Sequence, residues 1–178
     1  MVSDSSRPFR LCVVCAGNIC RSPIAETVIR SRLADAGLGR LVVVDSAGTG
    51  GWHSGEPADH RALAALTRRG YDGSAHRARQ FRRDWFDDVD IVLALDRENF
   101  ADLYALAPDD DARARIQLLR SYDQLALAAE DTDVPDPYYG DDDAFEQVLV
   151  MIETAADGLV EAIRDELSQP LDPDLAGR

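Results

Sequence analysis

The chain has 178 residues, 46% of them hydrophobic, which favours one domain with a sizeable core over a disordered chain. No apolar run approaches the roughly 20 residues that span a bilayer. The polar segment Met1–Pro8 lacks the apolar centre of a secretion signal, so we expect a cytoplasmic protein. The formal net charge of −14 argues against binding to nucleic acid or to an anionic membrane.

Short apolar runs alternate with helical patterns along the chain. In order, we predict a strand at Leu11–Val14, a helix at 24–36, a strand at Leu41–Val44, a helix at Ala58–Arg69, a strand at Ile91–Leu95, a helix at Asn99–Ala107, a strand at Ile116–Leu119 and a helix at Asp143–Leu167. Gly37 and Gly70 are expected to end the first two helices.

The apolar runs are nearly continuous rather than alternating, which is typical of parallel strands covered on both faces. We therefore predict an α/β protein with a single-domain three-layer fold, in which a four-stranded parallel sheet has helices on both faces. This domain is expected to span residues 9–168, with flexible tails at 1–8 and 169–178. Such folds place active sites at the carboxyl ends of their strands.

The segment Cys15-Ala-Gly-Asn-Ile-Cys-Arg21-Ser22-Pro23 follows the first predicted strand and leads into a helix. A tight loop with Gly17 at a helix N-terminus is an anion-binding geometry, because loop amides and the helix dipole both favour negative charge. Pro23 suits the first helical turn, and Ser22 is a candidate N-cap.

A cysteine and an arginine six positions apart suggest a nucleophile that faces a bound anion. The surrounding amides and the helix N-terminus are expected to favour the thiolate form of Cys15. Arg21 can bind two oxygens of a phosphate group at once. The pattern therefore predicts attack of Cys15 on a phosphoryl group held by Arg21.

Residue counts exclude several other chemistries. All 19 basic residues are arginine, which excludes a Schiff-base lysine and the lysine of a nucleotide-binding P-loop. The three cysteines Cys12, Cys15 and Cys20 lie within nine residues and do not form a disulfide framework. Neither they nor the three histidines supply the paired ligands of a zinc site, so we expect no metal and no cofactor.

The segment CAGNICRSPIAE (15–26) resembles the signature of the low-molecular-weight protein tyrosine phosphatases, with the bacterial, actinobacterial-type branch as the best match. Further matching segments follow in order: DSAGTGGWHSG (45–55), AHRARQF (75–81), DIVLALDREN (90–99), LLRSYD (118–123) and DPYYGDDDAFEQV (136–148). The resemblance covers approximately Leu11 to Leu167.

This resemblance implies a metal-independent enzyme that hydrolyses phosphotyrosine in proteins through a phosphocysteine intermediate. It assigns the nucleophile to Cys15, the phosphate clamp to Arg21 and the general acid and base to Asp136. A phenolate leaves far more readily with a proton, an effect worth ~10²–10⁴ in rate. The residues alone do not select Asp136 among the many aspartates of the chain.

The resemblance also implies roles around these three residues. The phosphate-binding loop comprises Ala16, Gly17, Asn18, Ile19, Cys20, Arg21 and Ser22. Asn18, Ser22 and His76 are expected to support the loop, and Ser22 to hydrogen-bond the thiolate. Trp52, Tyr138 and Tyr139 are expected to wall the substrate pocket, where aromatic rings suit a phosphotyrosine.

The resemblance also allows a reversible disulfide between Cys15 and Cys20. We expect a monomer by default. An arsenate reductase of the same fold needs further cysteines downstream, and none follows Cys20. Two other rival functions are disfavoured. A non-catalytic phosphotyrosine-binding module usually lacks the nucleophile, the arginine or the acid, and all three are present here. A phosphatase that acts on small molecules or phosphoarginine is less expected, because the aromatic segment DPYY (136–139) favours phosphotyrosine.

Overall fold

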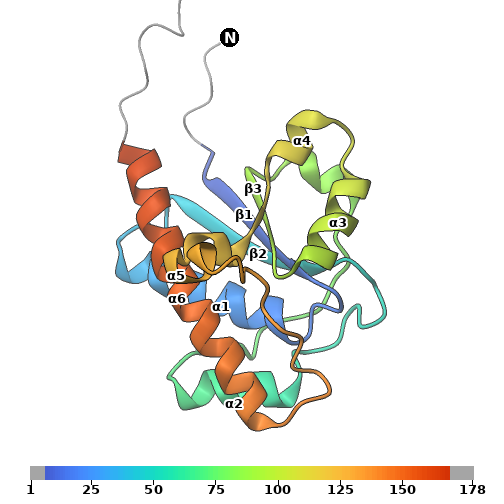
Figure 1. Cartoon of the computed structure of the whole chain (residues 1–178), viewed down its shortest axis with the longest axis vertical. Coiled ribbons are helices and arrows are strands. Elements are labelled where there is room, and N and C mark those ends of the chain that lie inside the picture. The colour runs from blue at the N-terminus through green and yellow to red at the C-terminus, as the bar shows by residue number, and fades with distance from the viewer. Residues whose placement is uncertain (1–6, 169–178) are drawn as a thin grey trace, which may run out of the picture.

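The four predicted apolar runs form one parallel sheet in the computed structural model, which describes residues 7–168 (Figure 1). Its strands are β1 (Phe9–Cys15), β2 (Val42–Gly48), β3 (Ile91–Ala94) and β4 (Ile116–Leu118), in the spatial order β2-β1-β3-β4. Most of the predicted tails, residues 1–6 and 169–178, lies outside the described residues. Arg7 is described, and its guanidinium lies 2.6 Å from the Asp90 carboxylate.

Helices connect and follow the strands. They are α1 (Arg21–Asp35), α2 (His60–Arg68), the 3₁₀ helix η1 (Arg83–Asp87), α3 (Arg97–Leu106), α4 (Asp110–Ala114), the 3₁₀ helix η2 (Leu119–Tyr122), α5 (Gln124–Ala128) and α6 (Asp142–Ser168). The sequence predicts α1, α2, α3 and α6, whereas the two five-residue helices α4 and α5 are additions. Between residues 7 and 168 no helix combines the length and apolarity needed to cross a bilayer.

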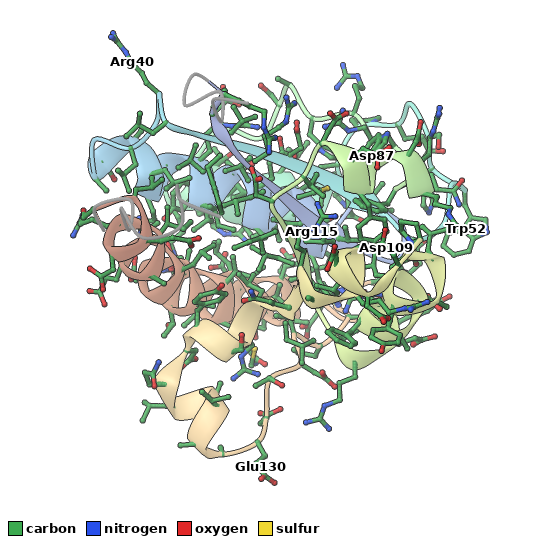
Figure 2. All side chains as sticks on the ribbon, turned by 90° about the horizontal axis from the view of Figure 1, so that it is seen from above. Arg40, Trp52, Asp87, Asp109, Arg115 and Glu130 are labelled. Carbon is green, nitrogen blue, oxygen red and sulfur yellow. The ribbon has the colours of Figure 1, made fainter. Side chains whose placement is uncertain are left out.

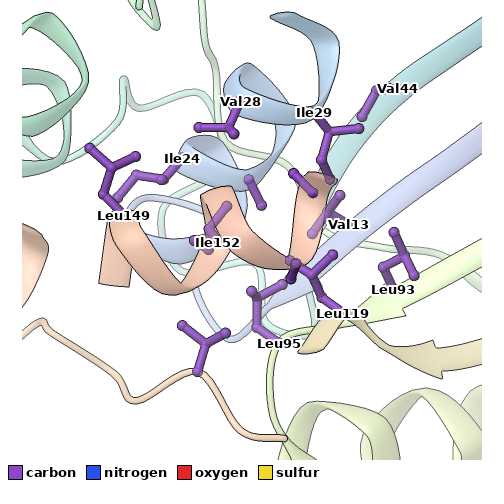
Figure 3. Close-up of a cluster of buried hydrophobic side chains, with 14 of the residues drawn as sticks. Val13, Ile24, Val28, Ile29, Val44, Leu93, Leu95, Leu119, Leu149 and Ile152 are labelled. Carbon is purple, nitrogen blue, oxygen red and sulfur yellow. The ribbon is translucent and has the colours of Figure 1, made fainter. Parts of the chain in front are cut away.

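The sheet has a hydrophobic core on each face, and β1 contributes to both. Leu11 and Val13 pack with side chains of α1, α2 and α6, whereas Cys12 and Val14 face α3, α4 and η1. Figure 3 shows the first core, where side chains of α1 and α6 meet beside the strands. The predicted class, a four-stranded parallel sheet with helices on both faces, is confirmed.

The start of α1 differs from the prediction. Cys20, not Ser22, occupies the N-cap position, and no side chain caps the helix there. Ser22 lies inside the first turn, where its hydroxyl is buried and bonded to loop side chains. The predicted terminator Gly37 follows the helix with a φ of 76°, a left-handed conformation that glycine adopts without strain.

The strand order fixes the place of the phosphate-binding loop. From β1 the chain crosses to β2 on one side and then returns to β3 on the other, so the order reverses at β1. Cys15 is paired with Gly48 at the carboxyl ends of β1 and β2, and Val14 with Ala94 of β3. Loops from all three strands therefore meet around the residue after Val14.

Candidate active site

Backbone amides of neighbouring segments hold the loop between β1 and α1 by donating hydrogen bonds to its carbonyl groups. The backbone amides of Thr49, Gly50 and Asp59 donate to the carbonyls of Cys15, Ala16 and Ile19, at 2.8, 2.9 and 2.8 Å. Within the described part of the chain, the backbone amides of residues 16–20 donate no hydrogen bond. These amides are thus free to bind an anion at the start of α1.

Close backbone approach beneath the loop requires a glycine. A Cβ atom built on Gly48 would lie 2.6 Å from the Ala16 carbonyl oxygen and 2.8 Å from that of Gly50. Any larger residue at position 48 would therefore displace the loop.

Asn18 lies at the centre of a buried hydrogen-bond network and adopts a left-handed backbone conformation, with a φ of 57°. Its amide nitrogen donates to the hydroxyls of Ser22 and Ser46, at 2.8 and 3.0 Å. Its amide oxygen accepts from the Arg79 backbone N–H at 2.9 Å, and its carbonyl oxygen accepts from His76 Nε2 at 2.8 Å. Asparagine tolerates this conformation better than most residues, and four hydrogen bonds fix it.

Glu26 extends this network away from the loop. It accepts a hydrogen bond from the Ser46 hydroxyl and lies 3.6 Å from His76 Nδ1, and Arg30 also pairs with it. Burial acts to raise the pKa of Glu26, but the hydrogen bonds of His76 and Ser46 and the charge of Arg30 outweigh it, so the pKa lies below its ordinary value. An ionised Glu26 therefore orients two of the four partners of Asn18, Ser46 and His76.

Cys15 lies at the bottom of a pocket of about 180 Å³ that its loop shares with distant segments. The Ser22 hydroxyl oxygen lies 3.0 Å from the Cys15 sulfur. A hydroxyl at this distance can donate a hydrogen bond to a thiolate and stabilise its charge.

The Arg21 guanidinium is buried, with 3% of the side chain exposed, and carboxylates hold it. Its Nη1 donates to Asp96 at 2.5 Å and to the Val134 carbonyl at 3.0 Å, whereas Nη2 lies 3.4 Å from the Asp136 carboxylate. Burial acts to lower the pKa of Arg21, but the neighbouring Cys15 and both carboxylates outweigh it, and the pKa is raised. Arg21 thus stays charged and fixed.

Asp136 lies on the loop of residues 129–141 between α5 and α6, called here the Asp136 loop, and 52% of its side chain is exposed. The backbone N–H of Val134 anchors this loop by donating to the carbonyl of Leu95, the residue after β3, at 2.7 Å. Farther along, Arg61 of α2 donates to the carbonyls of Tyr138 and Gly140, each at 3.0 Å. The exposed carboxylate is therefore carried by a segment braced at both ends.

Aromatic side chains form the rim of the pocket. Trp52 and Tyr139 are largely exposed, at 74% and 97%, and Tyr138 is 39% exposed. The rings of Tyr138 and Tyr139 meet edge to face with centroids 4.9 Å apart. Figure 2 shows Trp52 projecting at the outer edge of the molecule. All three predicted wall residues thus line the same pocket as Cys15, Arg21 and Asp136.

The other two cysteines differ from Cys15 in their surroundings. Cys12 is fully buried in β1, and burial raises the pKa of its thiol far above the ordinary value. Burial raises the pKa of Cys20 to about 12, with the Asp59 charge acting in the same direction. All three cysteines are free thiols in this structure. No cluster of three or more histidine, cysteine or acidic side chains suited to a metal occurs within residues 7–168.

Sequence reasoning missed the residues that hold the predicted ones. Asp96 is the N-cap of α3, where it accepts from the Asn99 N–H, and it also binds Arg21. The available signal is its place directly after the third strand, at the same edge of the sheet as Cys15. Glu26, Ser46 and Arg61 carry no comparable signal, because their partners lie far along the chain.

Comparisons with known proteins all point to the same family. The family model described as low molecular weight phosphotyrosine protein phosphatase matches residues 10–169. A low molecular weight protein-tyrosine-phosphatase of Streptomyces coelicolor is 55% identical over 159 residues, which are 89% of this chain and 96% of that protein. The low molecular weight protein-tyrosine phosphatase A of Mycobacterium tuberculosis is 42% identical over 164 residues, 92% of this chain and 97% of that protein.

Solved structures show the same likeness. YfkJ of Bacillus subtilis superposes with a TM-score of 0.83 at 36% identity, over 92% of this chain and 99% of that one. A protein tyrosine phosphatase of Entamoeba histolytica, solved with Hepes in its active site, also gives a TM-score of 0.83, at 31% identity over 89% and 99% of the two chains.

Proposed function

Because the chain belongs to the low-molecular-weight protein tyrosine phosphatase family, we propose that it hydrolyses phosphotyrosine in proteins through a phosphocysteine intermediate on Cys15. The observation that carries this proposal is one pocket that holds Cys15, Arg21 and Asp136 together beneath an aromatic rim. The identification as a protein tyrosine phosphatase is established by the family; the roles of the individual residues are the proposal.

In the first step the Cys15 thiolate attacks phosphorus. The sulfur–phosphorus bond forms as the bond from phosphorus to the tyrosine oxygen breaks, and Asp136 gives its proton to that oxygen. Arg21 and the free amides of residues 16–20 bind the three equatorial oxygens of the phosphoryl group. Stabilising the negative charge on these oxygens in the transition state is the main contribution to catalysis of phosphoryl transfer. Asp96 keeps the Arg21 fork in the required orientation.

In the second step a water attacks the phosphocysteine. Asp136, now ionised, takes a proton from this water, the sulfur–phosphorus bond breaks, and inorganic phosphate leaves. The Ser22 hydroxyl, 3.0 Å from the sulfur, stabilises the departing thiolate by a hydrogen bond. The exposure of the Asp136 carboxylate suits both proton transfers, because leaving group and water reach it from the open side.

The rim favours phosphotyrosine over phosphoserine. Cys15 is buried at the bottom of the pocket, while Trp52, Tyr138 and Tyr139 rise around the entrance. A phenyl ring holds its phosphate far enough from the peptide backbone to reach the sulfur and can stack between these aromatic side chains. A phosphoserine side chain is too short to do so.

Trapping the intermediate tests this proposal. Rapid mixing with p-nitrophenyl phosphate, followed by acid quench and peptide mass spectrometry, is expected to find one phosphoryl group on Cys15. The Cys20→Ser variant is the matched control and is expected to retain the modification. Turnover without a phosphoryl group on Cys15, or with the group on another residue, would refute the mechanism.

A further inference from the structure

A second cavity, of about 470 Å³, adjoins the active-site pocket at Trp52, which lines both. Its lining residues are Thr49, Gly50, Gly51, Trp52, Gln80, Phe81, Asp102, Leu103 and Leu106. Apart from Trp52, none of them takes part in the proposed chemistry. A substrate protein that fills the active-site pocket has to continue across its rim, so this cavity lies beside the path of the flanking residues.

Trp52, which lines both cavities, packs on a glycine. A Cβ atom built on Gly50 would lie 2.2 Å from the indole ring, so the ring rests directly against the Gly50 backbone. Most of the ring nevertheless remains exposed. Trp52 therefore borders both cavities, and the exposed part of its ring is available to a ligand.

The lining of this cavity combines an apolar wall with one carboxylate. Phe81 and Leu103 are buried members of the hydrophobic core, and Leu106 is half-buried beside them. Asp102 is exposed one turn before Leu106 on α3 and is the one ionisable residue in the lining.

No ion pair within residues 7–168 neutralises Asp102. Three nearby arginines pair with other carboxylates: Arg97 lies 3.9 Å from Asp133, Arg113 lies 2.7 Å from Asp110, and Arg82, next to Phe81, lies 2.5 Å from Asp84. An unpaired carboxylate beside apolar surface and an aromatic ring fits a side chain with an apolar stem and a positive head.

We propose that this cavity binds an arginine or lysine side chain that flanks the phosphotyrosine in the substrate protein. The side-chain stem packs on Leu106 and the Trp52 ring, and the cation pairs with Asp102. Consecutive residues of an extended chain are about 3.4 Å apart, so a residue one or two positions from the phosphotyrosine spans the width of the indole. The net charge of −14 also attracts basic segments.

This inference deepens the proposed function, since it names the class of substrate protein that the phosphatase prefers. The test compares phosphotyrosine peptides that carry arginine or its neutral isostere citrulline at each of the two positions before and after the phosphotyrosine. The readout is the ratio of kcat/KM for the two peptides of each pair. Hydrolysis of p-nitrophenyl phosphate by every variant reports separately on the reacting centre.

At one or more positions the wild type is expected to prefer arginine about fivefold, the effect of an exposed ion pair. The preference is expected to vanish in Asp102→Asn and to reverse in Asp102→Arg, and to persist in the control Asp87→Asn, which removes an exposed carboxylate outside the cavity.

Three results would overturn the inference: equal rates for each peptide pair, a preference that survives in Asp102→Asn, or an equal loss in Asp87→Asn. The last would assign the preference to overall charge. Failure of the proposed function looks different, because the wild type would then hydrolyse none of the phosphotyrosine peptides, whichever residue flanks the phosphotyrosine.

Discussion

Replacing Asn18 by alanine is expected to lower the free energy of unfolding by about 4 kcal/mol. The change removes three side-chain hydrogen bonds, to Ser22, Ser46 and the Arg79 backbone, each worth about 1 kcal/mol net. It also places an ordinary residue at a φ of 57°, which costs about 1 kcal/mol. The same change loosens the loop around Cys15, so kcat/KM falls as well.

The variant Asn18→Gly separates these two contributions. Glycine loses the same hydrogen bonds but adopts the left-handed conformation freely, so its destabilisation is expected to be about 1 kcal/mol smaller than that of alanine. Urea unfolding of the three proteins, followed by circular dichroism, measures both differences. A loss below about 1 kcal/mol in Asn18→Ala would refute the role of the network as the support of the loop.

Other predictions concern the proton transfer and its support. Asp136→Asn is expected to lower kcat/KM about 10²–10³-fold for phosphotyrosine. The loss is expected to be far smaller for p-nitrophenyl phosphate, because p-nitrophenolate leaves without being protonated. An equal loss on both substrates would contradict the role of Asp136 as the acid. Arg61→Ala removes the hydrogen bonds that hold the Asp136 loop, so kcat/KM is again expected to fall more for phosphotyrosine than for p-nitrophenyl phosphate, with a fold-change about a tenth as large. An equal loss on both substrates would point to misfolding. Because the folded-state pKa of Glu26 is lowered, its stabilising contribution is present above the ordinary value of 4.5 and is lost as the pH falls through the folded-state pKa. The destabilisation caused by Glu26→Gln, measured by urea unfolding, is therefore expected to be large at pH 7 and to shrink below about 4.5; a pH-independent difference would contradict it.

The sheet and the long helices could be predicted because their signals are local. Buried parallel strands read as apolar runs, and α6 shows its apolar stripe over 27 residues. The predicted second strand stops at Val44, whereas β2 continues through Asp45 and Ser46 to Gly48. β2 is an edge strand that leads into the site, and its last residues include the polar Asp45 and Ser46. A prediction based on apolar runs therefore ends the strand too early.

The short elements and the supporting residues could not be predicted, because tertiary contacts define them. α4 and α5 have five residues each, too few for a helical period to show. Serine is a common N-cap residue, yet the Ser22 hydroxyl instead forms hydrogen bonds with the Cys15 sulfur and the Asn18 side chain. Arg61 lies 77 residues before Tyr138, whose carbonyl it binds, so spacing gives no hint of the contact.

The most direct test of the central claim is hydrolysis of a phosphotyrosine peptide in the presence of EDTA, with wild-type protein beside Cys15→Ser. We expect robust turnover by the wild type and none by the folded variant, since the hydroxyl cannot replace the thiolate as nucleophile. Turnover that survives in Cys15→Ser, or that EDTA abolishes in the wild type, would contradict the claim.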